Sequence, residues 1–235
     1  MPQTDPLITL EKKMVKYRDL VEVQAKDNNE EFVQLDNSIL PNGYLKEMSD
    51  MEKLFGSRIV VRKSVAKNLD CAQKILKAKH PGLTLHVTYG YRSLKIQTER
   101  YLKILRGVDG AFFSNPLDLY EEAHRFVAVP TVAGHPTGGA VDVAIINIKT
   151  GKFLDFGSKQ YDYSTKDCYV FTPNITKEQK SNRMLLRKTL LKVGFAPFDG
   201  EWWHFSYGDR EWAFYYNKKW AIYSQLNPEE IKQID

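Results

Sequence analysis

The chain has 235 residues, of which 43% are apolar and 27% charged, values typical of an ordinary globular protein with a sizeable core. Its 34 basic and 29 acidic residues leave a net charge of +5, without the long basic stripe and stacking aromatic residues of a nucleic-acid-binding protein. No stretch approaches the roughly 18 apolar residues of a membrane span and no signal peptide is visible, so we expect a cytoplasmic protein, with a periplasmic one as the alternative.

The first half of the chain shows an irregular start followed by a helix, a strand and a second helix. Residues 1–45 mix short apolar runs with polar clusters, and we expect loops and short strands that wrap around the main body. Apolar residues at helical spacing predict a helix over residues 64–80. Alternating residues predict a half-buried strand over residues 83–91, and a second helix follows over residues 93–105.

The second half of the chain begins with a long segment, residues 107–133, that has no sustained period and is punctuated by glycine and proline. We expect a long loop there that can include a short helical piece. The mostly apolar, β-branched residues 140–148 predict a buried strand, whereas residues 155–178 show no regular pattern. A third helix is predicted over residues 178–193 and a strand near residues 202–206.

The order of these elements indicates the fold class. Helices and strands are interspersed without the regular strand–helix–strand alternation of a parallel sheet. We therefore predict an α+β fold in which helices flank a central antiparallel sheet. The whole chain, residues 1–235, is predicted to form one domain, with residues 60–225 as its core and residues 1–50 as an N-terminal wrap.

Two of the five histidines stand in segments that suggest metal binding. His135 is followed seven residues later by Asp142, and His204 ends the sequence Glu-Trp-Trp-His. Two imidazoles and one carboxylate suit a catalytic zinc, which needs three protein ligands and one open position. On a regular strand His135 and Asp142 would face opposite ways, but Pro136 and the pair Gly138-Gly139 let the chain turn between them.

Glu201 lies three residues before His204, and at this odd interval the two side chains of a regular strand would point to opposite faces. Gly200 makes a bulge or a strand end plausible at this point. A carboxylate there can take a proton from a water molecule activated by a metal. Each motif alone is weak, because the His–Asp spacing occurs by chance and the Trp-Trp-His sequence suits a packed core. Together they leave a zinc site and a structural role as the two open interpretations.

Three motifs resemble those of the D-alanyl-D-alanine dipeptidases of the vancomycin-resistance type, zinc D,D-peptidases that share a fold with the hedgehog signalling domain. The matching segments are H-x-x-G-x-A-x-D from His135 to Asp142, E-x-W-H from Glu201 to His204, and Gly90-Tyr91-Arg92. The resemblance spans roughly residues 60–225. It implies a similar fold and one zinc ion per chain, held by His135, Asp142 and His204.

The resemblance also implies roles for three side chains that do not bind the metal. Glu201 matches the general base and Arg92 the residue that stabilises the transition state, although an isolated arginine would more often form a surface ion pair. Asp162 loosely matches a carboxylate that receives the substrate ammonium group, with a turn-capping role as the alternative. The chain departs from the family where Gly134 replaces a frequent serine and Tyr89 a frequent aspartate.

The activity that the resemblance implies is hydrolysis of D-alanyl-D-alanine, or similar dipeptides with D-residues, by a zinc-activated water in cell-wall metabolism. The expected partner is the small dipeptide, and we expect no nucleic-acid or membrane partner. The main alternative is a D,D-carboxypeptidase or murein endopeptidase that acts on longer cell-wall peptides. A zinc-binding module that recognises peptide without cutting it is a further alternative, against which Glu201 and Arg92 argue, since binding alone needs neither.

Overall fold

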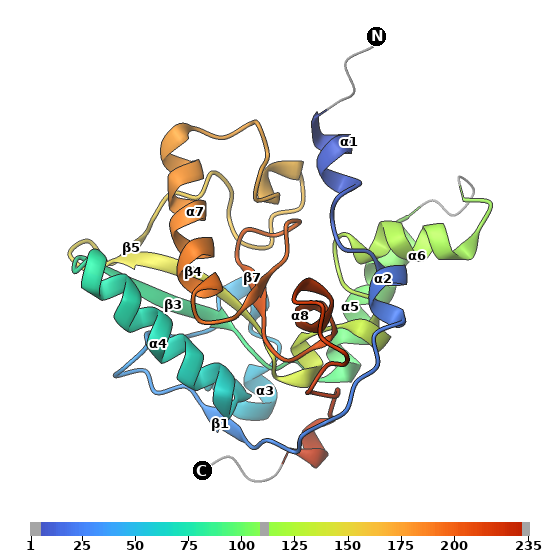
Figure 1. Ribbon diagram of the computed structural model, residues 1–235, viewed down its shortest axis with the longest axis horizontal. Coiled ribbons are helices and arrows are strands. Elements are labelled where there is room, and N and C mark those ends of the chain that lie inside the picture. The colour runs from blue at the N-terminus through green and yellow to red at the C-terminus, as the bar shows by residue number, and fades with distance from the viewer. Residues whose placement is uncertain (1–5, 109–112, 232–235) are drawn as a thin grey trace.

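The computed structural model of the chain describes residues 6–108 and 113–231, and its helices surround one larger antiparallel sheet (Figure 1). Strand order in this sheet is β3-β4-β7-β6, and the short β5 also pairs with β4. A second, two-stranded sheet pairs β1 with β2. The strands are β1 (Phe32–Gln34), β2 (Val60–Arg62), β3 (Leu83–Tyr89), β4 (Ala140–Asn147), β5 (Lys152–Phe153), β6 (Ala196–Pro197) and β7 (His204–Ser206).

The described α-helices range from short N-terminal pieces to two long core helices. They are α1 (Pro6–Glu11), α2 (Tyr17–Val21), α3 (Glu52–Phe55), α4 (Lys63–Lys79), α5 (Leu94–Gly107), α6 (Pro116–His124), α7 (Lys177–Leu191) and α8 (Arg210–Tyr215). Single 3-10 turns are η1 (Lys46–Met48), η3 (Pro130–Val132), η4 (His135–Thr137), η5 (Lys166–Cys168) and η6 (Pro228–Glu230). The α+β prediction with an antiparallel sheet is confirmed.

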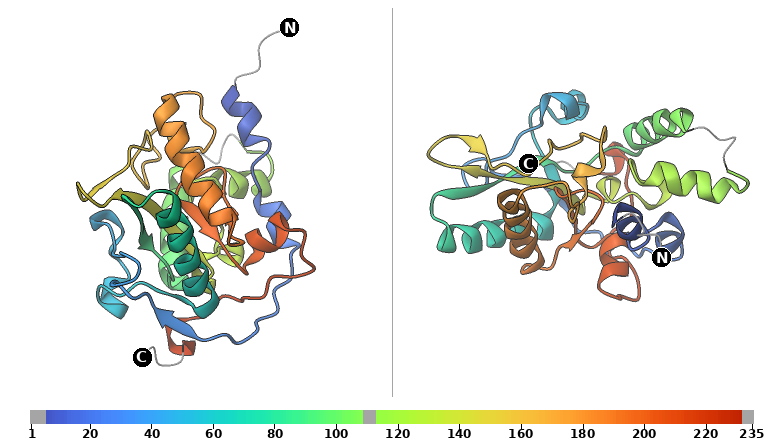
Figure 2. Two further views of the ribbon diagram at one scale, coloured as in Figure 1. Left: turned by 60° about the vertical axis from the view of Figure 1, so that its left-hand side comes forward. Right: turned by 90° about the horizontal axis from the view of Figure 1, so that it is seen from above.

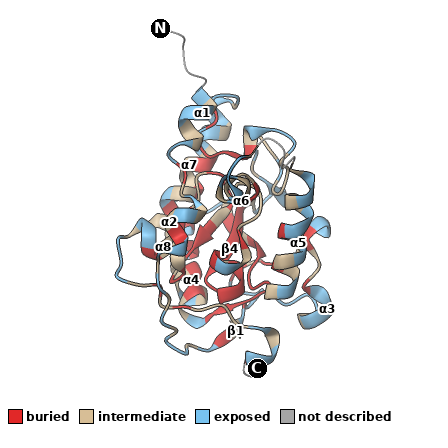
Figure 3. Ribbon diagram, turned by 90° about the vertical axis from the view of Figure 1, so that its right-hand side faces the viewer, coloured by how far each residue is buried: buried red, intermediate tan, exposed pale blue. Residues whose placement is uncertain are grey.

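The largest apolar cluster lies between the sheet and the pair α4 and α7, which run side by side over one face (Figure 2). Apolar residues recur along α4 at helical spacing and are buried: Val65, Leu69, Ala72 and Leu76. Val141 and Val143 of β4 belong to the same cluster. Because side chains alternate along a strand, Asp142 between them points to the opposite face. Figure 3 shows burial concentrated on the central strand β4.

Most of the predicted elements are confirmed, with shifts of a few residues at their ends. The helices predicted over 64–80, 93–105 and 178–193 are α4, α5 and α7. The long segment 107–133 does contain a short helix, α6, which Asn115 caps through its side chain while Pro116 occupies the first turn. Residues 109–112 of that predicted loop, with Gly110, lie outside the described residues.

The expectation of loops and short strands over residues 1–45 is partly wrong. The segment does contribute the strand β1, but α1 and α2 are helices. A helix as short as α2 is not stable alone, so no local signal predicts it. Instead, Glu121 of α6 accepts hydrogen bonds from the backbone N–H groups of Tyr17 and Arg18, at 2.8 and 2.9 Å. Among the described residues, no helix has both the length and the apolar character needed to cross a bilayer.

Candidate metal centre

Asp142 lies in the middle of the candidate site because of its position in the sheet. On β4 it pairs with His204 of β7 on one side and with Tyr89 of β3 on the other. Directly opposite residues of an antiparallel pair project their side chains on the same face. Strand pairing therefore brings Asp142 and His204 together, although they are far apart in the sequence.

His135 reaches the same point through the turn that the sequence predicts. The 3-10 turn η4 contains His135 and Pro136, and Gly138 ends it with a φ of +72°. That left-handed backbone favours glycine, and a Cβ atom there would lie only 2.2 Å from the ring of Phe32. The chain then enters β4 at Ala140, so that His135 and Asp142 face each other in spite of their odd spacing.

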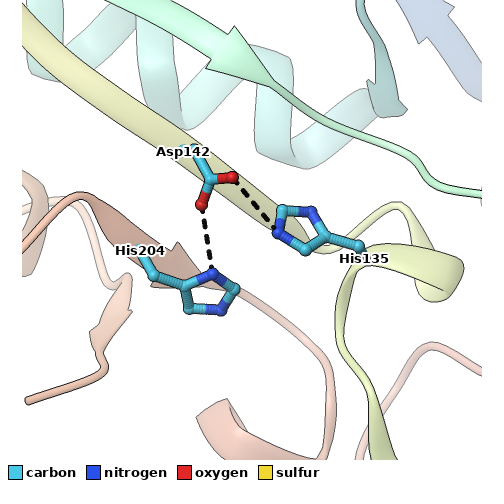
Figure 4. A group of neighbouring side chains, drawn as sticks. All are labelled: His135, Asp142 and His204. Carbon is cyan, nitrogen blue, oxygen red and sulfur yellow. Dashed lines mark hydrogen bonds and ion pairs between the residues drawn. The ribbon is translucent and has the colours of Figure 1, made fainter. Parts of the chain in front are cut away.

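The three side chains form one compact cluster (Figure 4). Oδ2 of Asp142 lies 3.4 Å from Nε2 of His135, and Oδ1 lies 3.2 Å from Nδ1 of His204. One ligand atom from each of the three residues falls within 4.8 Å of the others. Two imidazole nitrogens and a carboxylate oxygen match the donor set of a catalytic zinc, and the residues present therefore fit this metal.

The hydrogen bonding of His135 leaves the correct nitrogen free for a metal. Its Nδ1 lies 2.8 Å from the carbonyl oxygen of Gly90. A carbonyl can only accept a hydrogen bond, so Nδ1 carries the proton and Nε2, which faces Asp142, keeps its lone pair. Burial lowers the pKa of His135 to about 4, which keeps the ring neutral at physiological pH. A neutral imidazole is the form that binds a metal.

Glu201 lies beside the cluster, just before β7 begins. The strand end that the sequence requires between Glu201 and His204 is thus observed. Its Oε1 accepts a hydrogen bond from the hydroxyl group of Tyr163 at 2.7 Å, and its Oε2 lies 4.0 Å from Nδ1 of His204. Burial is the largest cause that raises the pKa of Glu201 to about 7. A raised pKa makes the carboxylate a stronger base than an ordinary glutamate side chain.

Arg92 is buried three residues after the end of β3, and two neighbours hold its guanidinium group. Nη1 donates to Oε1 of Gln97 at 2.8 Å, and Nε donates to the hydroxyl group of Tyr89 at 3.3 Å. The guanidinium also stacks on the Tyr89 ring, 4.6 Å from its centroid. Tyr89 in turn donates to Asp50 at 2.6 Å. Tyr89, which stands where the resembling family often has an aspartate, thus orients Arg92 itself.

One small cavity, of about 110 Å³, connects these side chains. His135, Asp142, His204, Glu201 and Arg92 all contribute to its lining. Pockets for drug-sized ligands typically enclose roughly 300–1,000 Å³, so the cavity suits a small substrate.

The structure does not bring Asp162 to the cluster. Its Oδ1 accepts hydrogen bonds from the backbone N–H and the hydroxyl group of Ser164, at 3.1 and 2.6 Å, which is the turn-capping role considered as the alternative. Its neighbours Tyr161 and Tyr163 line the cavity, but Asp162 is not among the lining residues. The assignment of the substrate ammonium to Asp162 therefore has no support from its position.

A second carboxylate, which the sequence analysis missed, lies against His204. Oε2 of Glu211 is 3.5 Å from Nε2 of His204, on the side of the ring that faces away from Asp142. Glu211 lines the cavity, and its Oε1 is buried without a hydrogen-bond partner among the described residues. Glu211 stands in the first turn of α8, outside any motif, and only the folding of α8 back onto the sheet reveals the contact.

Gly134 has a structural explanation. A Cβ atom at this position would lie 2.1 Å from Oδ2 of Asp209, the buried residue that caps α8. The serine often found in the resembling family would therefore displace Asp209 here.

Imidazoles and carboxylates that cluster in a small cavity, next to a buried carboxylate with a pKa near neutrality, are the arrangement of a metallopeptidase. Comparison with known proteins also indicates a peptidase. The profile of peptidase family M15, described as D-ala-D-ala dipeptidase, matches residues 41–225, and the chain belongs to this family.

Individual relatives carry the same description. A D-alanyl-D-alanine dipeptidase of Synechocystis sp. is 28% identical over 205 residues, which cover 77% of this chain and 82% of the relative. A D-alanyl-D-alanine dipeptidase of Enterococcus faecalis is 27% identical over 77 residues, 33% of this chain and 38% of the relative. Among solved structures, VanYB in complex with D-Alanine-D-Alanine aligns with 86% of this chain and 94% of its own, at 16% identity and a TM-score of 0.43.

Proposed function

We propose that this protein hydrolyses free D-alanyl-D-alanine, or a closely similar dipeptide with D-residues, with one zinc ion held by His135, Asp142 and His204. The observation that carries the proposal is the buried cluster of these three side chains in a chain of the D-Ala-D-Ala dipeptidase family. Family membership supports the peptidase activity, and the donor set supports zinc. When bound, zinc supplies Lewis acidity and lowers the pKa of a water ligand to about 7.

Glu201 is proposed as the general base and acid of the reaction. Its carboxylate takes a proton from the attacking water and later passes that proton to the leaving amino group. The buried position of Glu201, its pKa of about 7 and its hydrogen bond from Tyr163 support this role. The hydroxyl group of Tyr163 also fixes the direction in which the carboxylate points.

Arg92 is proposed to stabilise the negative charge that develops on the substrate carbonyl oxygen. Its guanidinium group is buried and held by Gln97 and Tyr89, so it is oriented before the substrate arrives. A charge fixed in this way stabilises a transition state without the cost of reorganisation. Removing one such donor typically lowers kcat by about 10²–10³-fold.

The cavity of about 110 Å³ favours a dipeptide over the longer cell-wall peptides of a D,D-carboxypeptidase or murein endopeptidase. Kinetics on D-alanyl-D-alanine and on its N-acetyl form, side by side, test this preference. We expect kcat/KM to be much higher for the free dipeptide, because the acetyl group adds bulk to a substrate that must fit this small cavity. Equal values for the two substrates would contradict a dipeptidase and support the carboxypeptidase.

A further inference from the structure

Part of the cavity wall comes from a segment that lies outside the family match. Residues 11–23, here called the N-terminal wall, contribute the side chains of Val15 and Leu20 to the cavity lining. The family match begins only at residue 41. Figures 1 and 2 show α2, the helix of this segment, beside α6 and α8, and the described contacts agree.

Glu121 of α6 anchors the middle of the N-terminal wall. Its carboxylate accepts hydrogen bonds from the backbone N–H groups of Tyr17 and Arg18, and a further one from Nε of Arg18 at 2.9 Å. Arg18 also pairs with Asp118, one helical turn earlier on α6, at 2.9 Å. Both the backbone and the side chain of Arg18 are thus bound to the same face of α6.

Both ends of the wall are also anchored. Nη1 of Arg210, at the start of α8, donates to the carbonyl oxygens of Leu20 and Val21 at 3.3 Å, and to that of Val23. At the other end, Glu11 pairs with Arg125 and, at 2.7 Å, with Lys166. Contacts before, within and after the short stretch between Val15 and Leu20 hold it as a fixed part of the cavity.

The surface that the wall completes is apolar. Leu20 is buried against Ala123, Val129 and Val132, and Val15 packs at the edge of the same cluster. Apolar side chains from three further segments also line the cavity: Phe126, Val127, Val132 and Phe198. The same lining includes the polar and charged groups of the candidate metal centre. A bound dipeptide can therefore meet the metal centre with its peptide group and the apolar surface with a side chain.

We propose that the N-terminal wall determines side-chain selectivity, so that Val15 and Leu20 restrict the substrate to dipeptides with small apolar side chains. This inference rests on the proposed hydrolysis of D-alanyl-D-alanine and adds the residues that exclude larger dipeptides. It assigns a role in the active site to a part of the chain that contains none of the motif residues.

Val15→Ala and Val15→Phe test the inference in opposite directions. Val15 is only half-buried, so both changes are tolerable for the fold. Its replacement by alanine enlarges the cavity. The ratio of kcat/KM for D-Leu-D-Ala or D-Ala-D-Leu to that for D-Ala-D-Ala should rise at least about tenfold, since one methylene in an apolar pocket changes discrimination by roughly 10–200-fold. Phenylalanine should fill the cavity and lower kcat/KM for D-Ala-D-Ala, with zinc content unchanged.

Met14→Ala is the matched control. Met14 precedes Val15 on the wall and is buried, but it packs into the main core and does not line this cavity. Its variant should keep the wild-type ratio. If Val15→Ala hydrolyses D-Ala-D-Ala but its ratio of kcat/KM values equals that of the wild type, the selectivity role of the wall is overturned and the proposed function stands. A wild-type protein that binds zinc but leaves D-Ala-D-Ala intact would remove the proposed function, and the inference with it.

Discussion

At the scale of single residues, Glu201 combines the properties that a general base needs. It is buried beside the metal cluster, its pKa is raised to about 7, and Tyr163 fixes its orientation. Loss of general base help typically lowers the rate by about 10²–10⁴-fold. We therefore expect Glu201→Gln to keep its zinc and to lose activity by this factor. Glu122→Gln, which changes a carboxylate outside the cavity, is the control; wild-type turnover in Glu201→Gln would exclude the role.

The hydrogen bond between Tyr163 and Glu201 predicts a change in the pH profile. The hydroxyl group donates to the charged carboxylate and lowers the pKa of Glu201, so its removal raises that pKa further. Because the base must be deprotonated, the acidic limb of the kcat/KM profile of Tyr163→Phe should move to higher pH. Tyr44→Phe, whose hydroxyl group bonds to the carbonyl of Arg58 away from the cavity, should leave it in place. A limb that moved to lower pH would refute the hydrogen-bonding role.

Glu211 predicts an effect on metal affinity rather than on the chemical step. Its carboxylate faces Nε2 of His204 and can hold the ring so that Nδ1 points toward Asp142. Carboxylates in this position typically change metal affinity by about 10–100-fold. Competition with a chelator should show this loss of zinc affinity in Glu211→Ala and a smaller loss in Glu211→Gln. Unchanged affinity in Glu211→Ala would mean that the contact has no role in orienting His204.

At the scale of elements, the turn η4 was predictable and the N-terminal helices were not. Pro136 and the glycine pair mark the turn locally, since no other residue type suits a φ of +72° as well as glycine. The strand β4 and the helices α4, α5 and α7 follow from periodic apolar patterns. By contrast, α2 is stabilised by Glu121, which lies about a hundred positions further along the chain, and no local pattern records such a contact.

Gly138 allows a direct test of how tightly η4 is built. Gly138→Ala adds a Cβ atom in a left-handed conformation and within 2.2 Å of the Phe32 ring. Gly151→Ala is a matched control, because Gly151 has a φ of +68° and open space around it. Backbone strain alone costs about 1–2 kcal/mol, so urea unfolding should show that loss for Gly151→Ala and a larger one for Gly138→Ala. Equal losses in the free energy of unfolding would mean that the Phe32 ring moves aside without an energetic penalty.

At the scale of the whole molecule, the pairing of strands in the sheet brings together side chains that the sequence motifs identify only one by one. The motif segments indicated the five side chains at the cavity, but their common location depends on β4 lying between β3 and β7. This pairing places Asp142 between Tyr89 and His204, a relation that no spacing in the sequence contains. The absence of Asp162 from the cavity lining and the contact of Glu211 with His204 follow from the paths of loops and of α8, which tertiary packing determines.

The zinc content of His204→Ala, after equilibration with zinc and removal of unbound metal, tests the central claim most directly. The proposed site predicts one zinc ion per chain in the wild-type protein and a strong loss in this variant, because His204 supplies one of three ligands in a cluster within 4.8 Å. His80→Ala, which changes an exposed histidine at the end of α4, should keep the full zinc content. One zinc ion per chain retained in folded His204→Ala would contradict the account.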